Sequence, residues 1–315
     1  MKPDLESSRS FAMTLAHRAV RDIRRDGFRQ LRNYVDMCAL LARRPDLKRF
    51  FDHAQVVLQR TDSMYYKLIA SLVEQVKEDA ICTAGVNLGF DALISCASNN
   101  RRKNGETCSW FNVGTCNAPE LDAAITKAEE GCSFAWVLYA DNALTEQTVS
   151  VLQNHSHSVF FLLVDPQVLT PAVLEQISAC NNVITWLYLH QPELTSEACR
   201  AAKELRSRQL FYGFLVELGQ ADANQVVDQD WLDVLAQYGL FCVYARKPDM
   251  DHETAHKMYR KIVDSRIGGA AVPILLFDWE HDVPYINNAI TPHTAIGKCI
   301  PEGESFPLDL KCTEK

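Results

Sequence analysis

The sequence lacks the motifs that most often assign a function directly. It contains no Gly-x-Ser-x-Gly elbow, no Walker loop and no zinc-finger spacing. No run of apolar residues approaches the roughly 18–20 that a membrane span requires. The N-terminus has acidic residues early and arginines scattered through its apolar part, which is not the pattern of a secretory signal. These absences leave an ordinary globular chain whose function has to come from its fold.

The chain also lacks the cysteine pattern of a disulfide framework. Its 11 cysteines are an odd number and are spread over all 315 residues. In a chain of this length without an export signal, that distribution favours reduced thiols. We therefore expect a cytoplasmic protein.

Charge is distributed unevenly along the chain. Residues 1–50 hold 12 Lys/Arg against 6 Asp/Glu, a net of +6, whereas the remaining residues hold 20 against 34, a net of −14. An acidic body argues against a nucleic-acid binder. Residues 10–42 show helical periodicity broken near Gly27, with arginines crowding the other faces. This basic helix predicts contact with anionic lipid or an acidic protein partner, or is simply a packed helix with a solvated arginine face.

From residue 109 onward, apolar runs alternate with amphipathic segments. The runs lie at 109–116, 133–140, 158–165, 182–190, 209–217, 240–246 and 272–278. Helix starts are marked by Pro119, Thr145, Pro171 after Thr170, and Thr195-Ser196. Nearly all-apolar strands that alternate with helices indicate a covered parallel sheet. We predict an α/β fold, a partial (β/α) TIM-like barrel of six to seven parallel strands, with an N-terminal helical leader. The competing fold is a doubly wound sheet, but no glycine-rich phosphate loop follows the first strand.

The expected organisation has three parts. Residues 1–107 form the helical leader packed on the barrel, residues 108–290 the barrel, and residues 291–315 a C-terminal tail. The leader contains further predicted helices at 45–60 and 62–80, and the polar residues 98–108 are predicted as the loop that joins the leader to the barrel.

Three stretches together resemble the radical S-adenosylmethionine enzymes, in the bacterial branch with a helical leader and a SPASM-like, cysteine-rich C-terminal extension. They are the leader phrase at 62–94, the strand and helix order from Trp110 to Asp278, and the phrase PILLFDWEHDVPYINNAI at 273–290. The resemblance covers roughly residues 30–290. It implies a [4Fe–4S] cluster held by three thiolates in a Cys-x3-Cys-x2-Cys loop after the first strand, with the open iron chelating S-adenosylmethionine.

The chain departs from that pattern at three places. The matching loop, residues 114–124, keeps only Cys116. Asp141 and Asn142 stand where the family's Gly-Gly-Glu-Pro run contacts the cofactor, and Asn287, Asn288 and Ala289 replace a Gly-Gly-Cys segment. We therefore expect no cluster, no S-adenosylmethionine cleavage and no metal site.

The resulting expectation is a degenerate barrel protein that acts as a protein-interaction or regulatory subunit. By analogy with the family, such a copy keeps its partner-binding surface, and the basic N-terminal helix is the predicted surface for a protein partner or a second copy. A further alternative is a radical enzyme with the unconventional ligands Cys108, Cys116 and Cys132.

A different alternative keeps catalysis without radical chemistry, because a barrel places its ligand face at the carboxyl ends of its strands. We predict His190, Glu217 and Asp165 as catalytic residues there, with His190 as the best candidate for acid–base work. The substrate-binding candidates are Arg246, Lys247, Asp278 and Trp279. Such a site suits a lyase or hydrolase with a small anionic substrate. Polar residues at strand ends also occur simply because the strands meet solvent there.

Overall fold

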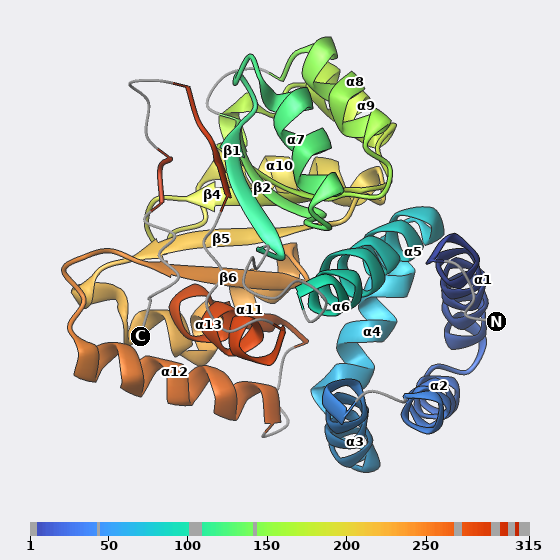
Figure 1. Ribbon diagram of the computed structural model, residues 1–315. Helices are drawn as coiled ribbons and strands as arrows, with labels where there is room; N and C mark the ends of the chain where they lie inside the picture. The colour runs from blue at the N-terminus through green and yellow to red at the C-terminus, as the bar shows by residue number, and fades with distance from the viewer. Residues whose placement is uncertain are drawn as a thin grey trace.

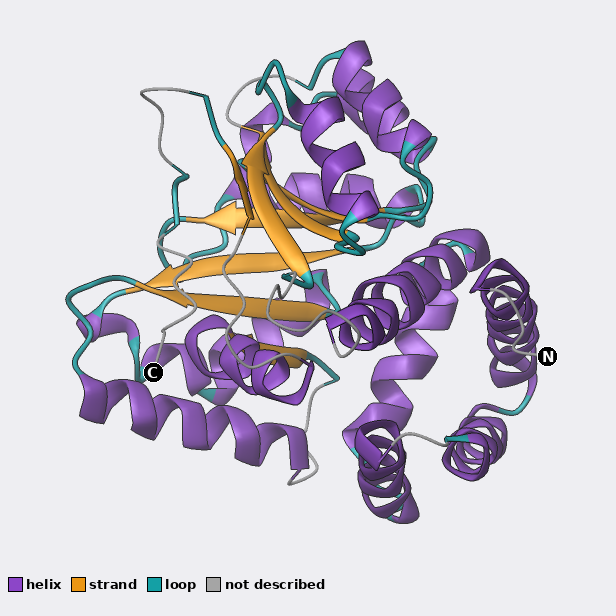
Figure 2. Ribbon diagram, in the orientation of Figure 1, coloured by secondary structure: helices purple, strands orange, loops and turns teal. Residues whose placement is uncertain are grey.

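The sheet is the centre of the molecule, and all of its strands are parallel (Figure 1). The computed structural model describes residues 5–42, 45–100, 109–140, 144–267, 273–290, 297–301 and 306–308. Figure 2 shows helices on both sides of the sheet. The predicted α/β class with a parallel sheet is therefore confirmed.

The sheet has eight strands, ordered β7-β6-β5-β4-β3-β2-β1-β8. Their bounds are β1 Phe111–Thr115, β2 Ala135–Ala140, β3 Val159–Val164, β4 Val183–Leu189, β5 Tyr212–Leu218, β6 Phe241–Arg246, β7 Leu275–Asp278 and β8 Gly297–Cys299. Each strand from β1 to β6 pairs with the next one in the chain, as in a singly wound (β/α) barrel. In a doubly wound sheet the chain returns to the middle after a few strands and adds the later strands on the other side of the first one. The consecutive order of β1 to β7 excludes that topology.

β8 pairs with β1, as the last strand of a barrel does, but in the described residues β7 and β8 do not pair. The curved sheet therefore has an opening at this position. The described sheet has one strand more than the six to seven predicted. The additional strand is β8, which the sequence does not indicate because it has only three residues and no apolar run. Gly114 permits its close approach, since a Cβ there would lie 2.8 Å from the Cys299 carbonyl oxygen.

Six helices follow β1 to β6 and cover the outer face of the sheet. Their bounds are α7 Leu121–Glu130, α8 Glu146–Asn154, α9 Pro171–Ser178, α10 Ser196–Ser207, α11 Gln229–Tyr238 and α12 His252–Ile267. The predicted caps Thr145, Thr170 and Thr195 each accept a hydrogen bond from a backbone N–H of the first helical turn. Threonine side chains thus set where three of these helices begin.

Alternation along the strands separates two cores. Leu138, Leu162 and Phe214 point outward and pack under the outer helices. The inward residues belong to a second cluster. It contains strand side chains and side chains of the helices that pack on the concave face. This inner cluster includes Val113, Val137, Leu163, Trp186, Leu215, Val243, Trp279 and, from the C-terminal tail, Leu308. The interior of the curved sheet is therefore filled with side chains.

The leader lies beside the ends of the sheet where the strands begin (Figure 1). It comprises α1 Leu5–Arg25, α2 Gly27–Leu41, α3 Pro45–Gln59, α4 Met64–Gln75, α5 Glu78–Val86, the π-helical segment η1 Asn87–Ser95 and α6 Cys96–Asn100. The predicted break near Gly27 is confirmed. The predicted helix at 62–80 is two helices, because Val76 is extended and the Lys77 N–H donates to the Gln209 carbonyl. Residues 96–100 are helical, whereas the sequence predicts a loop from residue 98.

One helical stretch, Glu78–Ser98, is long and apolar enough by composition to cross a membrane. Within the protein, 56% of its apolar window is buried. Asn87 in this stretch donates hydrogen bonds to the carbonyls of Ser156 and Ser158, just before β3. These contacts are those of a core helix that closes the amino-terminal end of the sheet.

Candidate functional site

The three residues predicted as catalytic lie together at the carboxyl end of the sheet. Asp165 follows β3, His190 follows β4, and Glu217 is in β5, each at an inward-facing position. His190 Nε2 lies 2.9 Å from Asp165 Oδ1, and His190 Nδ1 lies 3.9 Å from Glu217 Oε2. The imidazole therefore stands between two carboxylates from neighbouring strands.

Two tyrosines complete this group, which we call the mouth cluster: Tyr139, Asp165, Tyr188, His190 and Glu217. The Tyr139 hydroxyl donates to Asp165 Oδ2 at 3.2 Å. Burial, and then a hydrogen bond to Glu217, raise the pKa of Tyr188, so its hydroxyl stays protonated. The Tyr188 ring also lies 4.2 Å from the His190 ring, between centroids. Each carboxylate is thus oriented by a tyrosine.

Sequence reasoning gave neither tyrosine a functional role; it considered Tyr139 only as a bulky residue that could fill the mouth. The signal that could have found them is strand parity: Tyr139 and Tyr188 occupy inward positions near the ends of β2 and β4. In an apolar strand they read as core residues, since aromatic side chains are common inside sheets. Only their hydroxyl partners distinguish them from the phenylalanines nearby.

The mouth cluster is accessible from solvent. The His190 side chain is 62% exposed, whereas those of Asp165 and Glu217 are 15% and 20% exposed. A histidine with one nitrogen oriented by a carboxylate and its other edge open is suited to proton transfer. The cluster can therefore present an acid–base group to a ligand at the mouth.

The predicted anion-binding pair is not brought together. Lys247 points inward, and its Nζ donates to the His190 carbonyl at 2.9 Å. Arg246 points to the outer face, where its Nη2 donates to Asp278 Oδ1 at 2.6 Å. Consecutive strand residues face opposite sides of a sheet, so these two neighbours cannot serve one ligand. Arg246 and Asp278 are therefore not mouth residues, contrary to the expectation.

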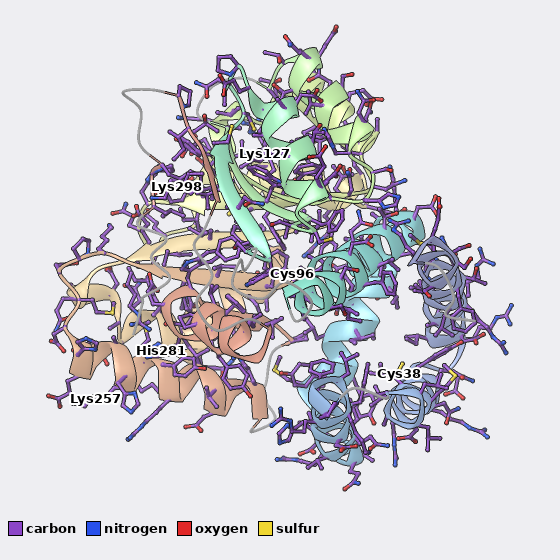
Figure 3. The ribbon with its side chains drawn as sticks, in the orientation of Figure 1. Cys38, Cys96, Lys127, Lys257, His281 and Lys298 are labelled. Atoms are coloured by element: carbon purple, nitrogen blue, oxygen red, sulfur yellow. The ribbon has the colours of Figure 1, made fainter. Side chains whose placement is uncertain are left out.

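Arg246 belongs to a second group, which we call the outer ion-pair cluster: Arg246, Asp278, Glu280 and His281. Asp278 has no exposed surface, and the Arg246 side chain is 13% exposed. His281 Nδ1 lies 3.0 Å from the same Asp278 oxygen, and Glu280 Oε1 accepts from the Arg246 backbone N–H at 3.0 Å. The His281 ring stacks on Tyr259 at 4.2 Å, so the cluster joins β6, β7 and α13 (Trp279–Ile290) to α12 (Figure 3).

The two carboxylates of this cluster respond differently to burial. Burial opposes ionisation of Asp278, but hydrogen bonds from His281 and Arg246 outweigh it and lower the pKa of Asp278. Burial, with a smaller contribution from the charge of Asp278, raises the pKa of Glu280 to about 7, although the hydrogen bond from the Arg246 backbone opposes the rise. Nearby, Arg266 pairs with Asp282 through both oxygens, one of them at 3.0 Å. These contacts tie the last strand and helix to the outer layer.

Trp279 does not line the mouth. It is 3% exposed and lies in the inner cluster, with ring centroids 5.4 Å from Phe111 and 6.1 Å from Trp186. Phe111 is the first residue of β1, so the indole reaches toward the amino-terminal end of the interior. Above it, Phe306 of the tail packs on Tyr139 at 6.4 Å. Trp279 is therefore a buried residue inside the curved sheet and does not line the mouth.

The predicted cofactor-binding residues divide into two cases. Asp141 and Asn142 lie outside the described residues. Cys116 follows β1, but its parity directs it outward, and it packs with the outer core. It lines a cavity of about 280 Å³ beside α7 and α8, together with Asn117, Pro119, Asp122, Gln147 and Thr148. This cavity is separate from the mouth cluster.

The alternative cluster ligands are not brought together either. Cys132 precedes β2 at the beginning of its strand, whereas Cys116 follows β1 at the end of its strand. A strand of this length separates them by on the order of 15–20 Å, too far for one cluster. Cys108 lies outside the described residues. Over the described ranges, no three Cys, His, Asp or Glu side chains stand close enough to hold a metal ion.

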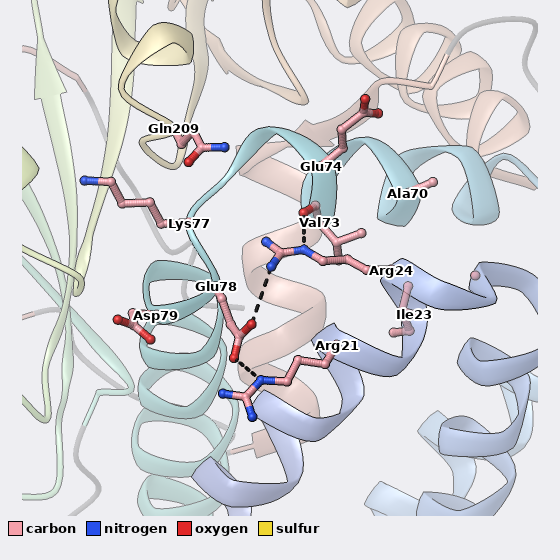
Figure 4. A pocket seen from close by; sticks show the side chains of 11 residues that line it. Arg21, Ile23, Arg24, Ala70, Val73, Glu74, Lys77, Glu78, Asp79 and Gln209 are labelled. Atoms are coloured by element: carbon pink, nitrogen blue, oxygen red, sulfur yellow. Dashed lines mark hydrogen bonds and ion pairs between the residues drawn. The ribbon is translucent and has the colours of Figure 1, made fainter.

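The basic N-terminal helix is partly engaged inside the chain. Arg21 Nε lies 2.8 Å from Glu78 Oε1, and Arg24 Nε donates to the Val73 carbonyl at 2.8 Å (Figure 4). His17 Nδ1 also contacts Glu78 at 2.9 Å. These bonds attach α1 to α4 and α5 along a groove of about 940 Å³. Arg21 and Arg24 therefore stabilise the leader itself.

No protein-family model matches the chain, and no curated protein sequence matches it.

Proposed function

We propose that the chain is an enzyme, a lyase or hydrolase, that transfers a proton on a small polar substrate at the barrel mouth. His190 is the acid–base group. One observation carries this proposal: Asp165, His190 and Glu217 come from three consecutive strands and meet around one exposed imidazole. A general acid or base in such a position contributes about 10²–10⁴-fold to a rate.

The roles follow from the contacts of each side chain. Asp165 holds the Nε2 edge of the imidazole and so fixes the orientation of the ring. The Nδ1 edge is 3.9 Å from Glu217, too far for a direct hydrogen bond, so both groups are available to a substrate. Tyr188 and Tyr139 keep the carboxylates in place. Glu217 and His190 then exchange protons with the substrate.

The charge of the mouth favours a neutral or cationic substrate over the anionic one expected from the sequence. Asp165 and Glu217 carry two negative charges there, whereas Lys247 brings one positive charge. Arg246 contributes none, because Asp278 and Glu280 bind its guanidinium on the outer face. With His190 neutral, the site carries a net negative charge, and an anion would meet repulsion there.

A screen for turnover of small neutral and cationic substrates tests the proposal, with His190→Gln as the inactive variant. His252→Gln, which replaces an exposed histidine of α12, is the matched control. We expect turnover that falls by about 10²-fold or more in H190Q and is unchanged in H252Q. Turnover that survives in H190Q, or a screen in which no substrate is turned over, would contradict the assignment.

The second candidate is the degenerate radical S-adenosylmethionine relative that serves as an interaction subunit. Two observations favour it: Cys116 is directed away from the mouth, and Trp186 and Trp279 occupy the interior. The described cysteines do not fit a [4Fe–4S] cluster, because Cys116 and Cys132 lie at opposite ends of the sheet. Iron and sulfide analysis after anaerobic purification tests this candidate, and about four irons per chain would overturn it.

A further inference from the structure

A cavity of about 510 Å³, which we call the leader cavity, lies between α2 and the segment that joins α3 to α4. Its lining residues are Arg29, Arg32, Asn33 and Asp36 of α2, Thr61 of the connection and Tyr66 of α4. The helix α2 contacts both α3 and α4, in the leader beside the amino-terminal end of the sheet (Figure 1). The leader cavity is therefore separate from the mouth cluster, which lies at the carboxyl end.

One face of α2 supplies most of this lining. The four α2 residues occupy positions i, i+3, i+4 and i+7, counted from Arg29. At about 100° per residue they fall within about 100° of arc around the helix axis. Arg29 and Arg32 are about 4.5 Å apart along that axis, which makes them neighbours on the helix surface. Both guanidinium groups can therefore contact one ligand group in the leader cavity.

The two arginines differ from those of α1 in having no partner within the chain. Arg21 and Arg24 both pair with Glu78. In the part of the chain that the structure describes, the side chains of Arg29 and Arg32 form neither an ion pair nor a hydrogen bond. Holding the leader together thus does not use them, and their charges are available to a ligand.

The one acidic residue of the lining does not neutralise them. Asp36 follows Arg32 by four residues on the same helix face, a spacing at which ion pairs often form. Its Oδ1 instead accepts a hydrogen bond from Gln55 Nε2 of α3 at 2.8 Å. The lining therefore carries two positive charges and one negative charge, with the arginines at one end of the α2 stripe and Asp36 at the other.

The remaining lining residues are polar and mostly donors. Each guanidinium has five N–H donors and no acceptor, and Asn33 and Thr61 add an amide and a hydroxyl. Tyr66 is 5% exposed and forms the inner wall, with its own hydroxyl donating to the Leu58 carbonyl. A concave surface with two arginines and neutral donors matches the oxygens of a phosphate group, which guanidinium groups bind through paired hydrogen bonds.

We propose that the leader cavity binds a small phosphate monoester that also carries hydroxyl groups, as a sugar phosphate does. Arg29 and Arg32 hold the phosphate. Asp36, about 6 Å beyond Arg32 along α2, and Asn33 between them hydrogen-bond the hydroxyl groups. Because none of these residues belongs to the mouth cluster, this inference is independent of the proposed enzyme activity.

The test is isothermal titration calorimetry of the full chain with three probes: ribose 5-phosphate, inorganic phosphate and ribose. We expect both phosphates to bind, ribose 5-phosphate about tenfold more tightly than inorganic phosphate, and ribose not at all. Binding should weaken as salt is raised, because the guanidinium groups are exposed. Absence of phosphate binding at up to about 10 mM would overturn the proposal, and equal binding of the two phosphates would overturn the hydroxyl contacts.

Variants identify the residues that hold the phosphate. The double variant Arg29→Gln, Arg32→Gln is expected to weaken binding of both phosphates about tenfold or more. Arg200→Gln, which replaces an exposed arginine of α10, is the matched control and keeps full binding. Circular dichroism checks the fold, and the two single variants replace the double one if that unfolds. Unchanged phosphate binding in R29Q and R32Q would overturn the assignment.

Two further measurements examine the other end of the leader cavity. Asn33→Ala should reduce the advantage of ribose 5-phosphate over inorganic phosphate, and Asp36→Asn should strengthen binding of inorganic phosphate by removing a negative charge. Weaker phosphate binding in D36N would contradict this arrangement of charges. An acidic peptide that displaces ribose 5-phosphate at a tenfold lower concentration would assign the leader cavity to a protein partner and overturn the proposal.

Discussion

The mouth cluster and the outer ion-pair cluster lie at the same end of one sheet, but they differ in exposure to solvent and in their ion-pair partners. In the mouth cluster, His190 is 62% exposed and no arginine pairs with Asp165 or Glu217 in the described residues. In the outer ion-pair cluster, Asp278 is fully buried and binds Arg246 at 2.6 Å. An exposed imidazole held by one hydrogen bond is suited to contact a ligand, whereas a buried ion pair is needed by the fold.

Residue type at a strand end therefore does not show whether a charged side chain belongs to a ligand site or stabilises the fold. Arg246 and Lys247 are adjacent, basic and at the end of β6, yet they serve different clusters. The side of the sheet that each one faces decides this. Substitutions at these two positions therefore probe the comparison directly.

The largest effect is expected from Arg246→Met. It leaves Asp278 charged and buried without its arginine, which costs about 3–5 kcal/mol of the free energy of unfolding. Lys247→Met, at the next residue, is the control and should change that free energy by less than about 0.5 kcal/mol. Urea denaturation of both variants measures the difference. Equal stability of the two variants would show that the outer ion-pair cluster is not a structural support.

The next effect is a dependence of stability on pH that comes from Glu280. Burial raises its pKa in the folded chain to about 7, above the usual value of 4.5. The folded state then binds more protons than the unfolded one between these values, so stability falls as pH rises from about 4.5 to about 7. The loss is at most about 3.4 kcal/mol, since the two values differ by about 2.5 pKa units at 1.36 kcal/mol each.

Glu280→Gln removes the titrating group and should flatten the stability profile over that window. Asp278 does not contribute there, because its pKa is lowered and it titrates only under more acidic conditions. Denaturation at several pH values, for both proteins, measures the slopes. The same slope in E280Q and the natural chain would assign the pH dependence to another group.

A smaller effect is expected from Tyr188→Phe in the mouth cluster. The variant keeps the buried ring but removes the hydroxyl that hydrogen-bonds Glu217, at a cost of about 1 kcal/mol in stability. Activity should fall because Glu217 loses its orientation. Tyr139→Phe tests the equivalent bond to Asp165. Variants with natural stability and natural activity would contradict the positioning role of the two tyrosines.

The smallest effect on stability is expected from His190→Gln, although its effect on turnover is large. The side chain is mostly exposed, so the free energy of unfolding should change by less than about 0.5 kcal/mol. Comparison with R246M then separates the two clusters: one loses function and keeps stability, and the other loses stability. A loss above about 2 kcal/mol in H190Q would make the mouth cluster structural as well.

Sequence patterns were sufficient for the strands and for several helix ends. Strands β1 to β7 are apolar because both of their faces are covered, which makes them visible in one sequence. Thr145, Thr170 and Thr195 mark helix starts through a local hydrogen bond, so no distant residue is needed. β8 was missed because its pairing with β1 depends on space beside Gly114 rather than on its own composition.

The sequence by itself determined the alternation of strands and helices, the parallel sheet, and the presence of Asp165, His190 and Glu217 at strand ends. Local periodicity and chain order fix these features. Only the tertiary structure decided which charges meet: it turned Arg246 outward to Asp278, placed Trp279 in the interior and set two tyrosine hydroxyls on the mouth carboxylates. Such contacts join residues 26 or more positions apart, and they depend on the curvature and register of the sheet, which no local pattern records.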